Sequence, residues 1–168
     1  MRLLAVDPGE TTGFALFDTE SGESYFWAEP SAMDAVTYVN GKLHDGELEV
    51  LIVERFTISS RTVQATRGGS NTAIEIIGAL RWLAHTYSNQ HNEDGELRKT
   101  IPFVVQSPSD AKAFVTDEKL KRLGWYTPGK DHARDATRHL VTYMVRNGLL
   151  EPSSLLSSAE EEVAGGSS

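Results

Sequence analysis

The stretch RLLAVDPGETTGFALFD, residues 2–18, decides the fold of this chain. Residues 2–7 are an apolar run that ends in an acid. Pro8 and Gly9 then predict a turn, and residues 13–18 are a second strand-like run. Short runs of this kind joined by a tight turn favour antiparallel pairing. We therefore expect a β-hairpin whose buried first strand ends in a carboxylate.

Outward from this stretch, the pattern predicts both strands and helices. Strands are expected at residues 2–7, 13–18, 24–29, 48–54 and 101–106. Helices are expected at residues 31–44, 71–88 and 131–147, with two shorter ones beginning near 107 and 116. Three short consecutive strands imply antiparallel pairing, whereas strand–helix–strand units imply parallel pairing. We predict an α/β fold with a mixed five-stranded sheet, in which strands four and five run parallel to strand one, flanked by helices.

The length and composition suit a single globular domain. The chain has 168 residues, of which 39% are hydrophobic and 24% charged, and it has no cysteine. Disulfides, thiolate zinc sites and cysteine nucleophiles are thereby excluded, and a cytoplasmic setting fits. No apolar run approaches the roughly 18 residues of a membrane span. We expect one domain over residues 1–150 and a disordered acidic tail over residues 151–168.

The distribution of charge favours a nucleic-acid partner, although the net charge of −8 does not. Residues 1–54 carry two basic and eleven acidic side chains, a net charge of −9. Residues 55–146 carry fourteen basic and nine acidic side chains, a net charge of +5, and residues 147–168 carry only four glutamates. Because phosphate neutralisation depends on local basic surface, the central region could bind DNA.

Three acids stand where strands end or a helix begins. Asp7 ends the first strand, Glu54 ends the fourth, and Asp135 lies near the start of the last helix. Because strands one and four are expected to be central neighbours, Asp7 and Glu54 could meet at one edge of the sheet. Clustered carboxylates repel unless a cation neutralises them, and oxygen ligands suit Mg²⁺ or Mn²⁺. One such acid alone is more often a solvated turn residue, so the prediction depends on all three.

The segment KDHARDA, residues 130–136, adds a histidine to these acids. His132 and Asp135 are three residues apart and therefore share one face of a helix, with His139 one turn further along it. Taken alone, His132 would be a helix-start residue bonded to solvent.

Taken together, these segments resemble a known family. AVDPGETTGFALFD, LIVERF and KDHARDATRHLV, in this order and spacing, are similar to the three motifs of the RuvC family of crossover junction endodeoxyribonucleases. IIGALRWLA resembles the long helix of that family, with its glycine and then arginine. The likeness extends from residue 3 to about residue 146.

The resemblance implies a ribonuclease H-like fold, a homodimer, and nicking of Holliday junctions or other branched DNA. It assigns Mg²⁺, with Mn²⁺ as a substitute and two ions per active site, to Asp7, Glu54, His132 and Asp135. Asp7 would lie between the two ions, and His132 would ligate a metal or position the attacking water. A small, stand-alone, acidic member would suit a phage or mobile element, acting in the host cytoplasm.

The dimer and the DNA contacts are predicted from other parts of the chain. The apolar residues of helix 71–88 cover more than one face, which is more apolar surface than one sheet can bury. Such surplus surface is usually buried in a two-fold contact with a second copy of the chain. Phe56 lies two residues past Glu54, where the family presents an aromatic wedge a few positions past its second acid. The candidate DNA-binding residues are Arg55, Phe56, Arg61, Arg67, Lys112, Lys119, Lys121, Lys130 and Arg134.

Two other functions remain open. DPGETTG also resembles the first phosphate-binding hairpin of actin-like and sugar-kinase ATPases. Those proteins need a second similar domain and a later glycine-rich nucleotide loop, and 168 residues provide neither. The other alternative is a non-catalytic ribonuclease H-like module that binds nucleic acid. Its acids would normally have decayed, whereas every expected position is filled here.

Overall fold

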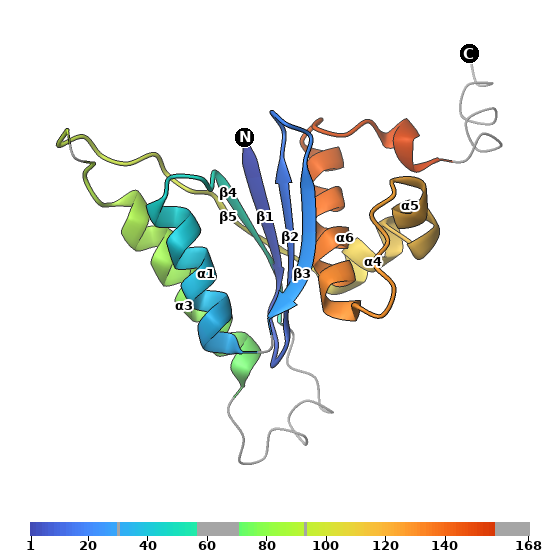
Figure 1. Cartoon of the computed structure of the whole chain (residues 1–168), viewed down its shortest axis with the longest axis horizontal. Coiled ribbons are helices and arrows are strands. Elements are labelled where there is room, and N and C mark those ends of the chain that lie inside the picture. Colours follow the sequence, from blue (N-terminus) through green and yellow to red (C-terminus); the bar gives the residue numbers. More distant parts are fainter. Residues whose placement is uncertain (30, 57–70, 93, 157–168) are drawn as a thin grey trace.

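The computed structural model describes residues 1–29, 31–56, 71–92 and 94–156, and it contains a mixed five-stranded sheet (Figure 1). The strands are β1 (Arg2–Asp7), β2 (Thr12–Asp18), β3 (Ser24–Glu29), β4 (Val50–Glu54) and β5 (Phe103–Gln106). Their order across the sheet is β3-β2-β1-β4-β5. β1 and β2 pair antiparallel, as do β2 and β3, whereas β4 runs parallel to β1 and β5 parallel to β4. The predicted sheet is confirmed.

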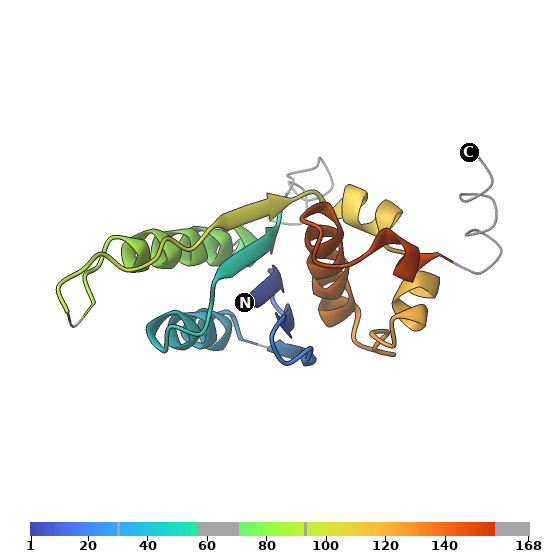
Figure 2. The same cartoon turned by 90° about the horizontal axis from the view of Figure 1, so that it is seen from above.

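Helices cover both faces of this sheet. They are α1 (Ala32–His44), α3 (Thr72–Ser88), α4 (Pro108–Phe114), α5 (Asp117–Arg122) and α6 (Asp131–Arg146). Figure 2 shows α1 and α3 on one side and α4, α5 and α6 on the other. Along β1, Leu4 and Val6 pack toward α1 and α3, whereas Leu3 and Ala5 pack toward α6. A strand buried on both faces explains the unbroken apolar run in the sequence.

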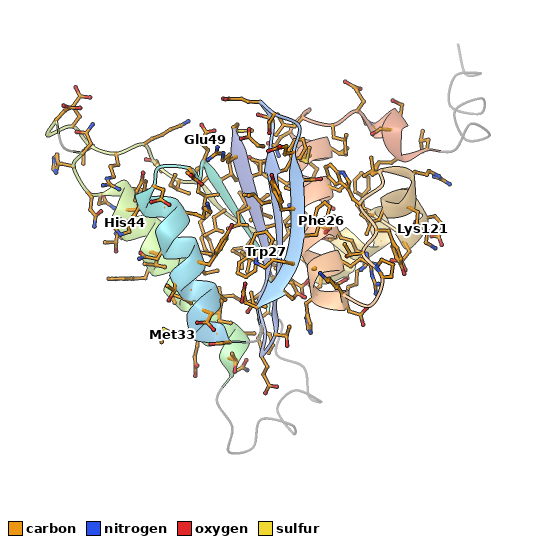
Figure 3. The ribbon with its side chains drawn as sticks, viewed as in Figure 1. Phe26, Trp27, Met33, His44, Glu49 and Lys121 are labelled. Carbon is orange, nitrogen blue, oxygen red and sulfur yellow. The ribbon has the colours of Figure 1, made fainter. Side chains whose placement is uncertain are left out.

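The aromatic residues of β3 follow the same alternation. Trp27 stacks on Phe14 with ring centroids 5.1 Å apart, on the side of α1. Phe26 packs against Trp125 on the side of α6, with centroids 5.6 Å apart. Figure 3 labels Phe26 and Trp27 beside each other on this edge strand. Trp125 therefore belongs to the packing between β3 and α6.

The ends of the helices follow from local residues. The Ser31 side chain accepts a hydrogen bond from the Asp34 backbone N–H at 3.3 Å and begins α1. Thr116 caps α5 in the same way. Gly124 and Gly148 have φ values of 72° and 68°, so each ends a helix in a left-handed conformation that glycine adopts without strain. β4 and β5 begin at residues 50 and 103, two residues later than the apolar pattern predicted.

The packed part of the chain continues past residue 150. A short 3₁₀ helix, η1 (Pro152–Leu155), follows α6, and Leu155 is buried with Val115, Leu120 and Val141. The Leu155 carbonyl also accepts a hydrogen bond from Arg122 at 2.7 Å. Residues 157–168 of the predicted tail lie outside the described residues. No helix within the described ranges has both the length and the apolar content to span a bilayer.

Gly13 allows α6 to pack very close to the sheet. A Cβ atom built on Gly13 would lie 2.0 Å from the His132 carbonyl oxygen and 2.6 Å from the Ala133 nitrogen. These are backbone atoms of the first turn of α6, so no side-chain rotation could relieve the clash. The glycine of the DPGETTG segment thus lets the start of α6 rest directly on β2.

We predict that Gly13→Ala lowers the free energy of unfolding by about 3 kcal/mol, because α6 must move away from the sheet. Gly41→Ala, inside α1, is the matched control, since a Cβ there meets nothing within 4 Å. It should stabilise the protein by about 1 kcal/mol through helix propensity. Urea unfolding followed by circular dichroism measures both. Equal stability of Gly13→Ala and wild type would contradict the close contact.

Candidate active site

Two acids end neighbouring central strands at the same edge of the sheet. β1 and β4 are parallel and in register, with Val6 opposite Val53. Asp7 and Glu54 are the next residues along each strand and the last of each. Parallel strands end at a common edge, so their carboxyl groups are delivered to one place. This is the juxtaposition that the sequence predicted.

Helix α6 brings the remaining predicted residues to this edge. His132 Nδ1 lies 3.0 Å from Asp7 Oδ2, and the His132 side chain is half exposed. Asp135 lies one turn further along α6, close enough for its charge to act on Asp7. All four residues predicted from the sequence, Asp7, Glu54, His132 and Asp135, therefore lie in one neighbourhood.

The surroundings of Asp7 disfavour its ionised form. It is 7% exposed, and its pKa is raised from the ordinary value of 3.8 to about 6, first of all by burial. The negative charges of Glu54 and Asp135 contribute to this rise, whereas the hydrogen bond with His132 opposes it. The negative charge at Asp7 is therefore only partly compensated by the protein.

Glu54 has a protein partner that the sequence did not reveal. Its Oε2 atom lies 2.7 Å from Nε2 of His139, a residue only 1% exposed. The other ring nitrogen of His139 lies 3.0 Å from Oε1 of Gln106. The spacing of residues on α6 placed His139 on the face of His132, but nothing local to Gln106 marked it. Only its position beside Glu54 on the adjacent strand could have done so.

Asp135 is held by two cations. Its Oδ2 lies 2.9 Å from Nζ of Lys112, and its Oδ1 accepts a hydrogen bond from Arg138. The hydrogen bond to Asp135 is also the first cause of the raised pKa of Lys112. Arg138 binds Asp117 and the Val115 carbonyl as well, so it braces α6 against the start of α5. Lys112 was predicted as a DNA contact, whereas the role of Arg138 was missed.

The donor set suits a hard divalent cation. Among the ranges that the structure describes, no three acidic or histidine side chains already form a closed set of metal ligands. The acids bind His132, His139, Lys112 and Arg138 instead. Asp7 nevertheless keeps a raised pKa, and a cation near it would offset the repulsion from Glu54 and Asp135. Carboxylate oxygens favour Mg²⁺ or Mn²⁺, so the residues fit such an ion.

The predicted DNA contacts on α5 and α6 have different surroundings. Lys121 is exposed, and its ammonium group lies 4.9 Å from the centre of the Tyr126 ring (Figure 3). Lys130 is exposed at the start of α6. Lys119 donates a hydrogen bond to the Phe114 carbonyl at 2.8 Å. The Arg134 guanidinium is largely buried and pairs with Asp131. Lys121 and Lys130 are thus the most accessible of these cations.

Arg55 and Phe56 follow Glu54 and line a pocket of about 370 Å³ beside α3. Ile74, Ile77, Arg81 and Val105 complete its walls. Arg61 and Arg67, also predicted as DNA contacts, lie outside the described residues. The only described part of the predicted 55–70 loop is therefore its first two residues, which border the helix expected to form the dimer.

Comparisons with known proteins agree with this fold. No family model and no curated protein matches the chain. Among solved structures, Thermus thermophilus RuvC has a TM-score of 0.55 at 14% identity, covering 89% of this chain and 98% of its own. T. thermophilus RuvC in complex with Holliday junction substrate gives 0.54 at 14% identity, covering 89% and 97%. The fowlpox virus Holliday junction resolvase gives 0.49 at 18% identity, covering 87% and 99%. The chain has the ribonuclease H-like fold of the RuvC structures.

We predict that Asp7→Asn stabilises the metal-free protein above neutral pH. The folded pKa of Asp7 lies above the unfolded one, so the protonated carboxyl favours folding. This contribution is complete below about pH 4 and is lost as the pH rises through about 6. At pH 8, asparagine avoids a cost on the order of 3 kcal/mol, whereas at pH 4 the two proteins should have similar stability.

Thermal unfolding with a chelator, scanned from pH 4 to 8, measures this difference. Asp110→Asn, at an exposed acid of α4, is the matched control and should show no such trend. Added Mn²⁺ should raise the melting temperature of wild type but not of Asp7→Asn. A difference between the two proteins that does not change with pH would contradict the assignment.

Proposed function

We propose that this protein is a metal-dependent endonuclease that nicks four-way DNA junctions and other branched DNA. The observation that carries the proposal is the meeting of Asp7, Glu54, His132 and Asp135 at the carboxyl edge of β1 and β4. Its support is the raised pKa of Asp7, which favours a cation there, and a ribonuclease H-like fold similar to that of a RuvC bound to Holliday junction substrate.

The roles of the residues follow from their surroundings. Asp7, Glu54, His132 and Asp135 would hold two Mg²⁺ or Mn²⁺ ions. Such ions, when bound, supply an acidified water and stabilise the leaving 3′ oxygen. His132, half exposed beside Asp7, would also be placed to orient that water. A metal bound to Asp135 would replace the half-exposed Lys112 side chain. The released ammonium group would then neutralise a DNA phosphate.

A second function is favoured by one observation. The acids of the site already bind protein cations or histidines, which would suit a ribonuclease H-like module that binds nucleic acid without cutting it. Nothing in such a module would require a buried Asp7 whose negative charge the protein compensates only in part. Cleavage of labelled DNA separates the two functions directly.

A homodimer through α3 is part of the proposal. Ile74 and Trp82 are 44% and 64% exposed and lie on one face of the helix, with Gly78 between them. A Cβ on Gly78 would meet nothing within 4 Å, and alanine would favour the helix by about 1 kcal/mol. The isolated chain therefore gives no reason for this glycine, whereas close approach of a second α3 would. Two active sites would suit paired cuts across a symmetric junction.

We predict that Asp7→Asn abolishes nicking of junction DNA while binding persists or tightens. Asparagine has the size of aspartate but no charge to hold a cation, and the basic residues that bind phosphate are elsewhere. Glu54→Gln and Asp135→Asn should behave alike, whereas the RuvC resemblance predicts that His132→Asp retains activity. Gel shifts and nicking assays on immobile and branch-migrating junctions, flaps, forks and duplex test this in Mg²⁺ and Mn²⁺. Near wild-type nicking by Asp7→Asn would refute the proposal.

We predict that Trp82→Glu converts a dimer into a monomer with an intact fold, because a charge cannot be buried in an apolar two-fold contact. Met33→Glu is the control, since Met33 is a similarly exposed apolar residue, 72% exposed, that lies on α1 and not on α3. Light scattering at micromolar concentration gives the mass, and circular dichroism checks the fold. A wild-type monomer that still cleaves junctions would show that α3 is not a dimer surface.

A further inference from the structure

His139 lies in a buried polar contact that the proposed roles of the acids leave unexplained. Its side chain is only 1% exposed, yet it carries two polar nitrogens into the interface between α6 and the sheet. Buried polar groups destabilise a protein unless they are hydrogen-bonded. Here Nε2 lies 2.7 Å from Oε2 of Glu54, and Nδ1 lies 3.0 Å from Oε1 of Gln106. Both ring nitrogens are satisfied.

The three side chains come from three separate elements. Glu54 ends β4, Gln106 ends β5, and the two residues are directly paired in the parallel register. His139 approaches them from the third turn of α6, one turn beyond Asp135. Because β4 and β5 are hydrogen-bonded neighbours and α6 packs on them, the ring is fixed from both sides. The contact therefore joins the helix that carries Asp135 to the strand that carries Glu54.

The chemistry of the partners fixes the direction of the hydrogen bonds. An ionised carboxylate can only accept, so Nε2 of His139 must carry the proton and donate to Glu54. The Gln106 amide has both a donor and an acceptor, so it can serve Nδ1 in either state of that nitrogen. A leucine or glutamate in place of Gln106 would lack this ability to do both. Gln106 thus holds the ring in the orientation that keeps Nε2 on Glu54.

We infer that His139 is a positioning residue that fixes Glu54 for metal binding, with Gln106 as the anchor of its ring. The inference rests on the proposed function, since it assigns Glu54 a metal. With Oε2 bound to His139, the orientation of the Glu54 carboxylate is fixed, and Oε1 would be turned toward a cation. Asp135 differs, because Lys112 and Arg138 contact its two oxygens. The Lys112 side chain is half exposed, so a metal could replace it. The Glu54 contact is more enclosed, with side chains 1% and 18% exposed, and it would stay in place when metal binds.

The test uses Mn²⁺ binding to the DNA-free protein, measured by electron paramagnetic resonance of free Mn²⁺. His139→Leu removes both hydrogen bonds and should weaken Mn²⁺ binding by about 10- to 100-fold. His139→Gln places an amide nitrogen near the position of Nε2 and should restore most of the affinity. His139→Asn reaches only the position of Nδ1 and should resemble His139→Leu. Gln106→Leu should weaken binding in the same direction, which keeps the test valid if His139→Leu fails to fold.

Thr142→Val is the matched control. Thr142 is a buried polar residue of α6 whose hydroxyl donates a hydrogen bond to the Arg138 carbonyl at 2.7 Å, so its loss tests general damage to the helix. It should bind Mn²⁺ like wild type. Nicking should follow the same order among the variants, and the defect of His139→Leu should shrink at high Mn²⁺, because affinity and not chemistry has been lost.

Three results would overturn the inference, and they can be told apart. If Asp7→Asn and wild type bind Mn²⁺ equally, the metal site is absent, and the proposed function falls together with the role of His139. If wild type binds Mn²⁺ and Asp7→Asn does not, but folded His139→Leu binds like Thr142→Val, only the role of His139 is refuted. If His139→Gln binds Mn²⁺ as weakly as His139→Leu, the role of His139 is also refuted, because the loss of affinity would then come from packing and not from the hydrogen bond to Glu54.

Discussion

The first turn of α6 lies directly against Gly13 of β2, and the arrangement of the candidate site depends on this contact. No side chain separates the two backbones, so the distance from the helix to the strand is set by the glycine itself. That distance places His132 within hydrogen-bond reach of Asp7 and His139 within reach of Glu54. A wider gap would leave these histidines without their acids. The DPGETTG segment therefore supplies both an acid and the space for the helix that completes the site.

The site is also a balance of charges. Bringing Asp7, Glu54 and Asp135 to one edge of the sheet raises the free energy of the folded state, and burial of Asp7 adds to it. The chain offsets part of this with its own groups: His132, His139, Lys112 and Arg138. The pKa of Asp7 nevertheless stays raised, at about 6. In the proposed function, a cation at this edge would offset the repulsion that remains.

The side chains that contact the three acids differ in how far the protein encloses them. Arg138 ties Asp135 to the start of α5 through Asp117 and the Val115 carbonyl, so removing it would disturb three elements. His139 is more enclosed still, at 1% exposure. Lys112 and His132, by contrast, have half-exposed side chains. In the proposed function, the enclosed groups would hold the carboxylates in position, and the exposed groups would give way to metal and phosphate.

The sequence by itself determined the strands, the helices, their caps and the three acids, whereas tertiary structure decided the partners of those acids. Apolar runs, the Ser31 cap and the helix-ending glycines act on residues nearby in the chain, so their effects could be predicted from local pattern. The excess apolar surface of α3 was also visible in the sequence, but only the fold distinguished the buried Ile76 from the exposed Trp82. His139 and Glu54 are 85 residues apart, and no local rule relates them. Their contact exists because β4, β5 and α6 pack together, and packing distances are properties of the assembled fold.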